Sequence, residues 1–354
     1  WRQARTLLRV IVILVLSSPT ACSSARHVRE DGGGSRECHQ IELRRPQSSK
    51  VDILFVIDNT GSMGNEQVQL THDVEPMFRE LINPTPRDGW TPPSVADLHV
   101  GVVSTDMGAL GNQIVGCYDA GDDGVLHNVR TQPDCSETYH DPDCENSGCP
   151  WIAHSSTHPN DGTDPSNPPI WDDFRCIATL GTGGCGFEQQ LESSHAALVE
   201  QTAPGMANEG FLREDSVLVI LYVTDEDDCS TPDSEMFNPA RTDLGSLNVR
   251  CALNEDRLYP ISRYHDAFLA LKDGDEDKLV IAAIAGIPTD GSWNVGDPVD
   301  ALRELRRQSP LNPNELVRSC DSIPNNAFHP VRLVEPAYSF PEAGILASIC
   351  PNSW

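Results

Sequence analysis

The 354-residue chain has few basic residues for its size. Lys and Arg together number 25, against 53 Asp and Glu, which gives a formal net charge of −28 at pH 7. Nucleic acids and anionic membrane surfaces are bound through basic patches, so this balance argues against both as partners. We expect a soluble protein outside the cytoplasm, and solubility alone is a sufficient reason for most of the carboxylates.

Common catalytic motifs are also missing. The sequence contains no Gly-x-Ser-x-Gly, no His-Glu-x-x-His and no phosphate-binding glycine-rich loop with Lys. None of the 12 cysteines forms a Cys-x-x-Cys, which argues against a zinc ribbon or a thioredoxin-like redox site. We therefore predict that the chain is not an enzyme. The alternative is a hydrolase whose active site lies in a cysteine-rich segment or in residues 286–330.

The first 22 residues have the pattern of an export signal. Three arginines among the first nine residues precede an apolar run at residues 10–16, which is too short to span a bilayer. Ala21-Cys22 resembles the cleavage point of a bacterial lipoprotein, where Cys22 would be lipidated; an ordinary cleaved signal peptide is the alternative. We expect a signal peptide at residues 1–21 and a Gly-, Ser- and Arg-rich tether at residues 22–50. The expected location is the periplasm, the outer membrane or the cell surface.

Cysteines behind an export signal indicate disulfides. The most local candidate pairs are Cys144 with Cys149 and Cys176 with Cys185. Residues 107–174 hold four of the cysteines, are rich in Gly, Asp, Pro and Asn, and have few apolar runs. We interpret this segment as a disulfide-pinned insertion on the domain surface.

Apolar strands alternate with helical patterns along the rest of the chain, which predicts an α/β fold with a mostly parallel, doubly wound sheet and helices on both faces. The expected strands are residues 52–57, 98–104, 216–223 and 278–285. The expected helices are residues 65–82, 187–202, 262–272, 298–307 and 343–350.

Oxygen-bearing side chains follow two of these strands. Asp58, Thr60 and Ser62 come after the first, and Asp225 comes after the third. Ligands bind at the carboxyl ends of strands in such sheets, and a set of carboxylates and hydroxyls suits a hard cation such as Mg²⁺. Asp58 alone could instead be a helix N-cap. If Asp58 and Asp225 converge, however, their repulsion requires a cation.

The set Asp58-x-Thr60-x-Ser62, followed by a distant Asp225, resembles the von Willebrand factor type A domain and its metal-ion-dependent adhesion site. The resemblance covers residues 51–350 and departs from the family by having Thr60 in place of the first Ser. It implies Mg²⁺, or Mn²⁺ or Ca²⁺, with an open coordination position. An Asp or Glu of a protein partner would complete that position, so the implied function is adhesion or another protein interaction in the envelope.

Two further departures leave alternatives open. The family has a distant Thr ligand, and here the corresponding loop offers Thr182, with Cys185 as a second alignment. The family has Gly after the last Asp, whereas this chain has Glu226, Asp227 and Asp228. These three acids could hold a second metal, tune the first or form a solvated turn. A structural envelope protein with a vestigial metal site also remains possible, with membrane contact only through Cys22.

Overall fold

The computed structural model describes residues 49–86, 93–117, 121–128, 150–155, 160–163, 169–293, 296–322, 325–340 and 344–350. The expected signal peptide, Cys22 and nearly all of the tether lie outside these residues, as does the pair Cys144 and Cys149. Within the described residues, no helix is both long and apolar enough to cross a membrane.

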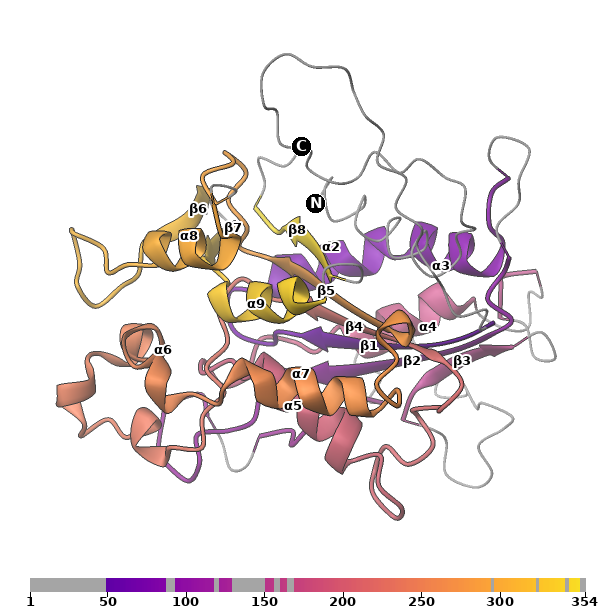
Figure 1. The fold of residues 1–354 in the computed structure, drawn as a ribbon, viewed down its shortest axis with the longest axis horizontal. Helices are drawn as coiled ribbons and strands as arrows, with labels where there is room; N and C mark the ends of the chain where they lie inside the picture. The colour runs from indigo at the N-terminus through magenta and orange to yellow at the C-terminus, as the bar shows by residue number, and fades with distance from the viewer. Residues whose placement is uncertain are drawn as a thin grey trace.

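A six-stranded sheet forms the centre of the molecule (Figure 1). In spatial order its strands are β3 (Ile152–Ser155), β2 (Asp97–Ser104), β1 (Lys50–Ile57), β4 (Val217–Val223), β5 (Leu279–Ala285) and β8 (Gly344–Ser348). All neighbouring pairs are parallel except β2 and β3. The expected α/β class with a mostly parallel sheet is confirmed, and the four predicted strands correspond to β1, β2, β4 and β5.

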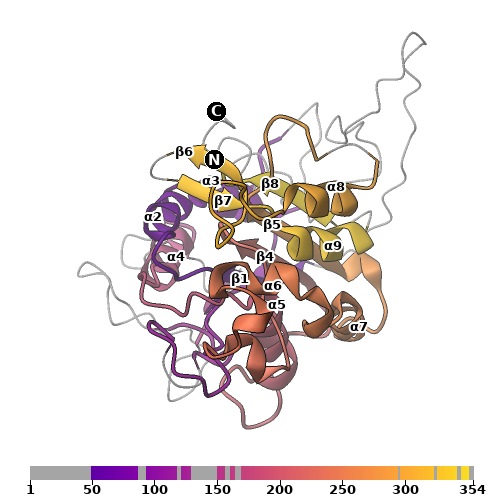
Figure 2. The ribbon, with the colours of Figure 1, turned by 90° about the vertical axis from the view of Figure 1, so that its left-hand side faces the viewer.

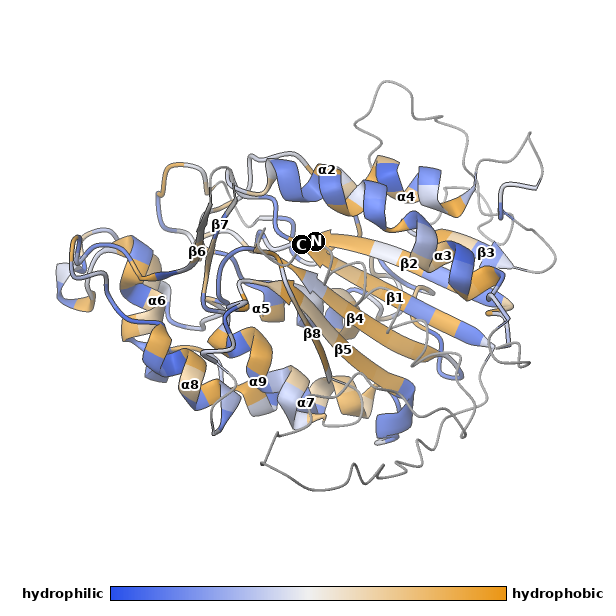
Figure 3. Cartoon of the chain, turned by 90° about the horizontal axis from the view of Figure 1, so that it is seen from above, coloured by the Kyte–Doolittle hydropathy of each residue, from blue (hydrophilic) through white to orange (hydrophobic). Residues whose placement is uncertain are grey.

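Helices pack against both faces of the sheet because the central strands are apolar on both sides. β4 and β5 are buried along their whole length, and β1 is buried from Val51 onward. On one face, Ile53 and Phe55 of β1 join a core with α2 (Gly64–Asp73), α3 (Glu75–Ile82) and α4 (Ile170–Ala178). On the other, Leu54 and Val56 join a core with α5 (Gln190–His195), α7 (Ile261–Ala270) and α9 (Val331–Ser339). Figure 3 shows the apolar strands lying between these two helix layers.

The remaining elements are short. A π-helical turn, Ala196–Glu200, continues α5, and α8 spans Pro298–Leu305. The chain between β4 and α7 contains α6 (Arg250–Leu253) and four 3₁₀ turns, Ser234–Phe237, Thr242–Leu244, Leu247–Val249 and Glu255–Arg257. A fifth 3₁₀ turn, Glu276–Lys278, leads into β5. β6 (Arg318–Ser322) and β7 (Asn325–Phe328) form a separate antiparallel ribbon at the end of the molecule where α6 lies, which faces the viewer in Figure 2.

The structure corrects two expectations about the secondary structure. Residues 344–348 form the edge strand β8 beside β5, and the helix of this region is α9, earlier in the chain. A short apolar run fits a strand and a buried helix equally well, so periodicity could not separate them. The predicted helix at residues 65–82 is two helices that meet at Val74. Pro76 lies in the first turn of α3, where a residue without a backbone N–H is tolerated.

Parts of the segment expected as an insertion belong to the main fold. β3 pairs with β2 at the edge of the sheet. Phe174 of α4 is fully buried, with its ring centroid 4.5 Å from that of Phe55 and 5.5 Å from that of Phe78. This helix therefore supplies core packing that the composition of the segment did not indicate.

Three disulfides lie within the described residues: Cys117–Cys185, Cys229–Cys251 and Cys320–Cys350. The expected pairing of Cys176 with Cys185 is wrong, because the fold brings the loop after β2 onto Cys185. The presence of disulfides indicates an oxidising compartment, in agreement with an extracytoplasmic location.

The amino end of the sheet holds a buried acid that is neutralised by basic side chains. Asp52 is fully buried, accepts the backbone N–H of Arg213 at 2.8 Å and forms an ion pair with its guanidinium at 2.6 Å. Lys272, also buried, donates to the Ser216 hydroxyl at 2.9 Å, and that hydroxyl donates to Asp52.

We expect Phe174→Ala to lower the free energy of unfolding by about 3–5 kcal/mol, because it removes a ring packed between two others and leaves a cavity. Val68→Ala is the control: Val68 is 50% exposed on α2, and its truncation should change stability by less than about 0.5 kcal/mol. Urea unfolding of the oxidised protein measures both. Equal effects of the two substitutions would show that α4 is not part of the core.

Candidate metal centre

The predicted site residues follow neighbouring strands. β1 pairs with β4 through Ile57 and Val223, and the backbone N–H of Asp58 donates to the Val223 carbonyl at 3.0 Å. Strands β2 and β3 lie on one side of β1, whereas β4, β5 and β8 lie on the other. Asp58 and Asp225 therefore lie where the order of strands reverses direction, which is where open α/β sheets bind ligands.

Asp58 is fully buried and held by three hydrogen bonds. Its Oδ1 accepts the N–H of Thr60 at 2.8 Å and the Thr60 hydroxyl at 2.7 Å, and its Oδ2 accepts the Thr224 hydroxyl at 2.7 Å. Burial raises its pKa, and the bonds from Thr224 and Thr60 act in the opposite direction. The residue that precedes α2 is Met63, so Asp58 is not the cap of that helix.

Ser62 connects Asp58 and Thr60 with Asp225. The Thr60 and Ser62 hydroxyl oxygens are 3.5 Å apart, and the Ser62 side chain lies close enough to Asp225 to lower the pKa of that carboxyl group, against the larger increase caused by burial. Asp225 is 4% exposed, and its Oδ1 has no hydrogen-bond partner. The structure thus brings Asp58, Thr60, Ser62 and Asp225 together in one continuous group. Burying a carboxylate oxygen that accepts no hydrogen bond costs free energy. A cation bound to that oxygen would remove this cost.

The loop of Thr182 packs directly against the group. Gly184 donates its N–H to the Asn59 carbonyl at 2.9 Å, and a Cβ on Gly184 would lie 2.1 Å from Asn59 Oδ1, so any larger residue would have to displace the Asn59 side chain. Gln67 bridges the two segments, donating to the carbonyls of Asp58 and Gly181 at 2.8 and 2.9 Å. Thr182 itself is exposed at the surface of this loop, with its methyl group against Gly64.

Cys185 cannot be the ligand of this loop. It is fully buried in the disulfide with Cys117, and its N–H donates to Asp106 Oδ2 at 3.0 Å. A thiolate is the metal-binding form of cysteine, and a disulfide has none. Thr182 is therefore the side chain through which this loop could contribute an oxygen.

Three more acids surround the group. Burial raises the pKa of Glu66, and Asp58 raises it further. Burial also raises the pKa of Asp225 and Glu188 well above their ordinary values, with further increases from neighbouring acids. For Glu226, burial and then Asp58 raise the pKa to about 7. The sequence does not single out Glu66 or Glu188; their only distinguishing feature is their position, just after the motif and just after the Thr182 loop.

Asp227 and Asp228 serve a different role. Asp227 forms an ion pair with Arg306 and accepts the N–H of Arg332 at 2.8 Å. Asp228 pairs with Arg332 at 3.0 Å and accepts the Leu191 N–H at 2.9 Å. Glu226, Asp227 and Asp228 were expected to hold a second metal or to tune the first. Among the ion pairs of the described residues, Asp227 and Asp228 each have an arginine partner and Glu226 has none.

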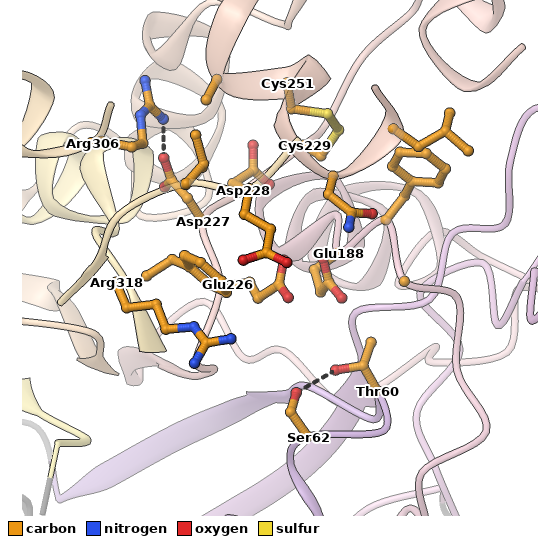
Figure 4. A pocket seen from close by; sticks show the side chains of 18 of the residues that line it. Thr60, Ser62, Glu188, Glu226, Asp227, Asp228, Cys229, Cys251, Arg306 and Arg318 are labelled. Atoms are coloured by element: carbon orange, nitrogen blue, oxygen red, sulfur yellow. Dashed lines mark hydrogen bonds and ion pairs between the residues drawn. A yellow bond between two sulfur atoms is a disulfide. The ribbon is translucent and has the colours of Figure 1, made fainter. Parts of the chain in front are cut away.

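A pocket of about 420 Å³ opens beside the group (Figure 4). Its charged and hydroxyl-bearing lining residues are Thr60, Ser62, Glu188, Glu226, Asp227, Asp228, Arg306, Glu315 and Arg318. Among the described residues that line it there is no His or Lys, and its two cysteines are joined to each other in a disulfide.

A second group of possible metal ligands lies on α5 and the turn that follows it. Ligand atoms of Glu192, His195 and Glu200 lie within 4.8 Å of one another. Arg263, however, pairs with Glu192 at 2.7 Å and lies 3.5 Å from His195 Nδ1. A guanidinium already supplies the positive charge there, so the edge of β1 and β4 is the stronger candidate.

No protein-family model matches this sequence, and no curated protein matches it either. The function must therefore be inferred from the geometry of the site.

The raised pKa of Glu226 has a consequence for stability. Its folded-state pKa is about 7 against an ordinary 4.5, so between these values the folded protein binds more protons than the unfolded chain. Stability is then lost as the pH rises from 4.5 to 7. In EDTA, we expect Glu226→Gln to remove this loss and to gain about 1–3 kcal/mol over the wild type at pH 7, but little at pH 4.5. Urea unfolding across this range measures the difference. A constant difference at all pH values would contradict the assignment.

Proposed function

We propose that residues 51–350 form a von Willebrand factor type A domain with a doubly wound sheet, and that it binds a protein partner through a divalent cation. The resemblance of the motif is the first support. The order of the strands, with Asp58 and Asp225 at its reversal point, is the second. Helices on both faces are consistent with the doubly wound arrangement.

The observation that carries this proposal is the continuous group of Asp58, Thr60, Ser62 and Asp225, with the orphan Oδ1 of Asp225. Of these four side chains, only Asp225 has a buried oxygen without a hydrogen-bond partner. Neighbouring acids add negative charge that a cation would neutralise. All the candidate donors are oxygens, which suits Mg²⁺, Mn²⁺ or Ca²⁺ and not a soft metal.

Asp58, Thr60, Ser62, Thr182 and Asp225 would hold the cation, directly or through water. Such a cation supplies electrophilic positions that an external carboxylate can occupy. Hydroxyls carry no charge, so a site with few direct carboxylates leaves the cation incompletely neutralised. Ser62 and Thr182 are both exposed, so the site is open on the side from which a partner would approach. We infer that the partner presents an Asp or Glu.

The proposal also includes export and membrane attachment, which the pattern of the first 22 residues predicts. A lipid on Cys22 and the tether at residues 22–50 would hold the domain at a bacterial envelope membrane, in the periplasm or at the outer membrane. The disulfides support export, and the lipid anchor rests on the sequence pattern alone.

Titration calorimetry tests the metal site. We expect the oxidised wild type to bind Mg²⁺ and Mn²⁺. Asp58→Ala should weaken this binding by more than about 100-fold, because second-sphere changes alone cost 10- to 100-fold. Asp266→Ala is the control, since Asp266 is an exposed acid on α7, far along the chain from the motif. Identical titrations of wild type and Asp58→Ala would refute the metal site.

A pull-down from envelope extract tests the partner. The immobilised wild type should retain a protein in Mg²⁺ and release it in EDTA, whereas Asp225→Ala should retain it in neither. Retention that survives both EDTA and the substitution would show an interaction that does not use the site.

A further inference from the structure

The buried side chain of Gln67 connects the segment of Asp58 with the loop of Thr182. Gln67 lies near the start of α2 and is 1% exposed. Its Nε2 donates to the carbonyls of Asp58 and Gly181 at 2.8 and 2.9 Å, and its Oε1 accepts the N–H of Gly181 at 3.1 Å. Turning the amide over would place its NH₂ group against an N–H and its oxygen against two carbonyls. The amide therefore fits in one orientation, in which it pairs with Gly181 on both sides.

The loop is fixed to the Asp58 segment on each side of Thr182. Before it, Gly181 is held by Gln67, at a φ of 82°, in the left-handed region that favours glycine. After it, Gly184 donates its N–H to the Asn59 carbonyl at 2.9 Å. Among the described residues, no hydrogen bond holds the Thr182 hydroxyl itself. The place of that hydroxyl therefore depends on the backbone that these two contacts fix.

We propose that Gln67 is a positioning residue of the metal centre: it holds Gly181 so that the Thr182 hydroxyl lies within reach of the cation bound by Asp58. This inference rests on the proposed function and adds a residue that lies outside the motif. Gln67 supplies no atom to the cation and acts through the loop. Residues that orient the ligands of a metal are worth about 10- to 100-fold in its affinity.

The other role open to Gln67 is purely structural. Three backbone groups have Gln67 as their partner, and satisfying them stabilises the fold whether or not a cation binds. Gln69 provides the comparison, because it lies two residues later in the same helix. Its Nε2 donates to Asp73 Oδ2 at 2.8 Å, a bond that stays within α2 and does not reach the loop.

A double-mutant cycle measured by Mg²⁺ calorimetry on the oxidised protein separates the two roles. Gln67→Met, which keeps the length of the side chain and removes its amide, should weaken binding by about 10- to 100-fold. Thr182→Val, which removes the hydroxyl, should weaken it as well. The double variant should bind about as weakly as the weaker single variant, because the hydroxyl that Gln67 positions is already gone. Losses that multiply would show that Gln67 does not act through Thr182 and would overturn the proposal.

The position of the loop is measured separately, in EDTA, by NMR hydrogen exchange. The Gly181 amide should exchange at least about 10-fold faster in Gln67→Met than in the wild type, because its acceptor is lost. Unchanged exchange would overturn the proposal. Faster exchange with unchanged Mg²⁺ affinity would also overturn it, since Gln67 would then hold the loop without serving the cation.

Gln69→Met is the matched control, and it should change neither the Mg²⁺ affinity nor the exchange of Gly181. An equal loss of affinity in this variant would assign the effect to α2 as a whole, against the proposal. Urea midpoints establish that each variant is folded. If Gln67→Met is not, Gln67→Asn replaces it, because its amide is one methylene short of spanning both carbonyls.

The wild type distinguishes failure of this inference from failure of the proposed function. A silent Mg²⁺ titration of the wild type refutes the metal centre, and the role of Gln67 falls with it. A wild type that binds Mg²⁺ and loses it in Asp58→Ala, while Gln67→Met binds as the wild type does, upholds the metal centre and overturns the role of Gln67 alone.

Discussion

The burial of several carboxyl groups at the carboxyl ends of β1 and β4 is the constraint on which the rest of the site depends. Asp58 and Asp225 follow directly from strands buried on both faces, so they cannot move toward solvent without moving the sheet. Glu66, Glu188 and Glu226 are then added by segments that pack over the same edge. Each raises the cost of ionising the others, and protons or cations must offset that cost.

The buried acids at the two ends of the sheet are neutralised in different ways. At the amino end, Arg213 and Lys272 surround Asp52, and the charges are balanced within the chain. Near the carboxyl end, Asp227 and Asp228 are balanced in the same way by Arg306 and Arg332. In both places the fold pairs a buried acid with a basic side chain. Asp225, by contrast, keeps a buried oxygen without a hydrogen-bond partner, which a cation from outside could satisfy.

The sequence was informative where a local pattern determines the structure. Apolar runs located four strands, and because parallel strands end at the same edge, Asp58, Thr60, Ser62 and Asp225 could be predicted to meet. Nothing local marks Glu66 or Glu188 as buried, since each belongs to an ordinary polar segment. The partner of Cys185 was out of reach as well. Cys117 lies 68 residues away, and only the folded path of the chain brings them together. β8 was mistaken for a helix because five residues carry too little periodicity.

The Cys117–Cys185 disulfide makes the position of the Thr182 loop depend on oxidation. It joins the segment after β2 to the loop that carries Thr182, and that loop packs on Asn59 through Gly184. Before oxidation, only weak contacts such as these would hold the loop in place. In the reduced chain this loop would therefore be held less firmly against Asn59 than in the oxidised chain, so the geometry around Asp58 depends on the redox state of two cysteines that lie outside it.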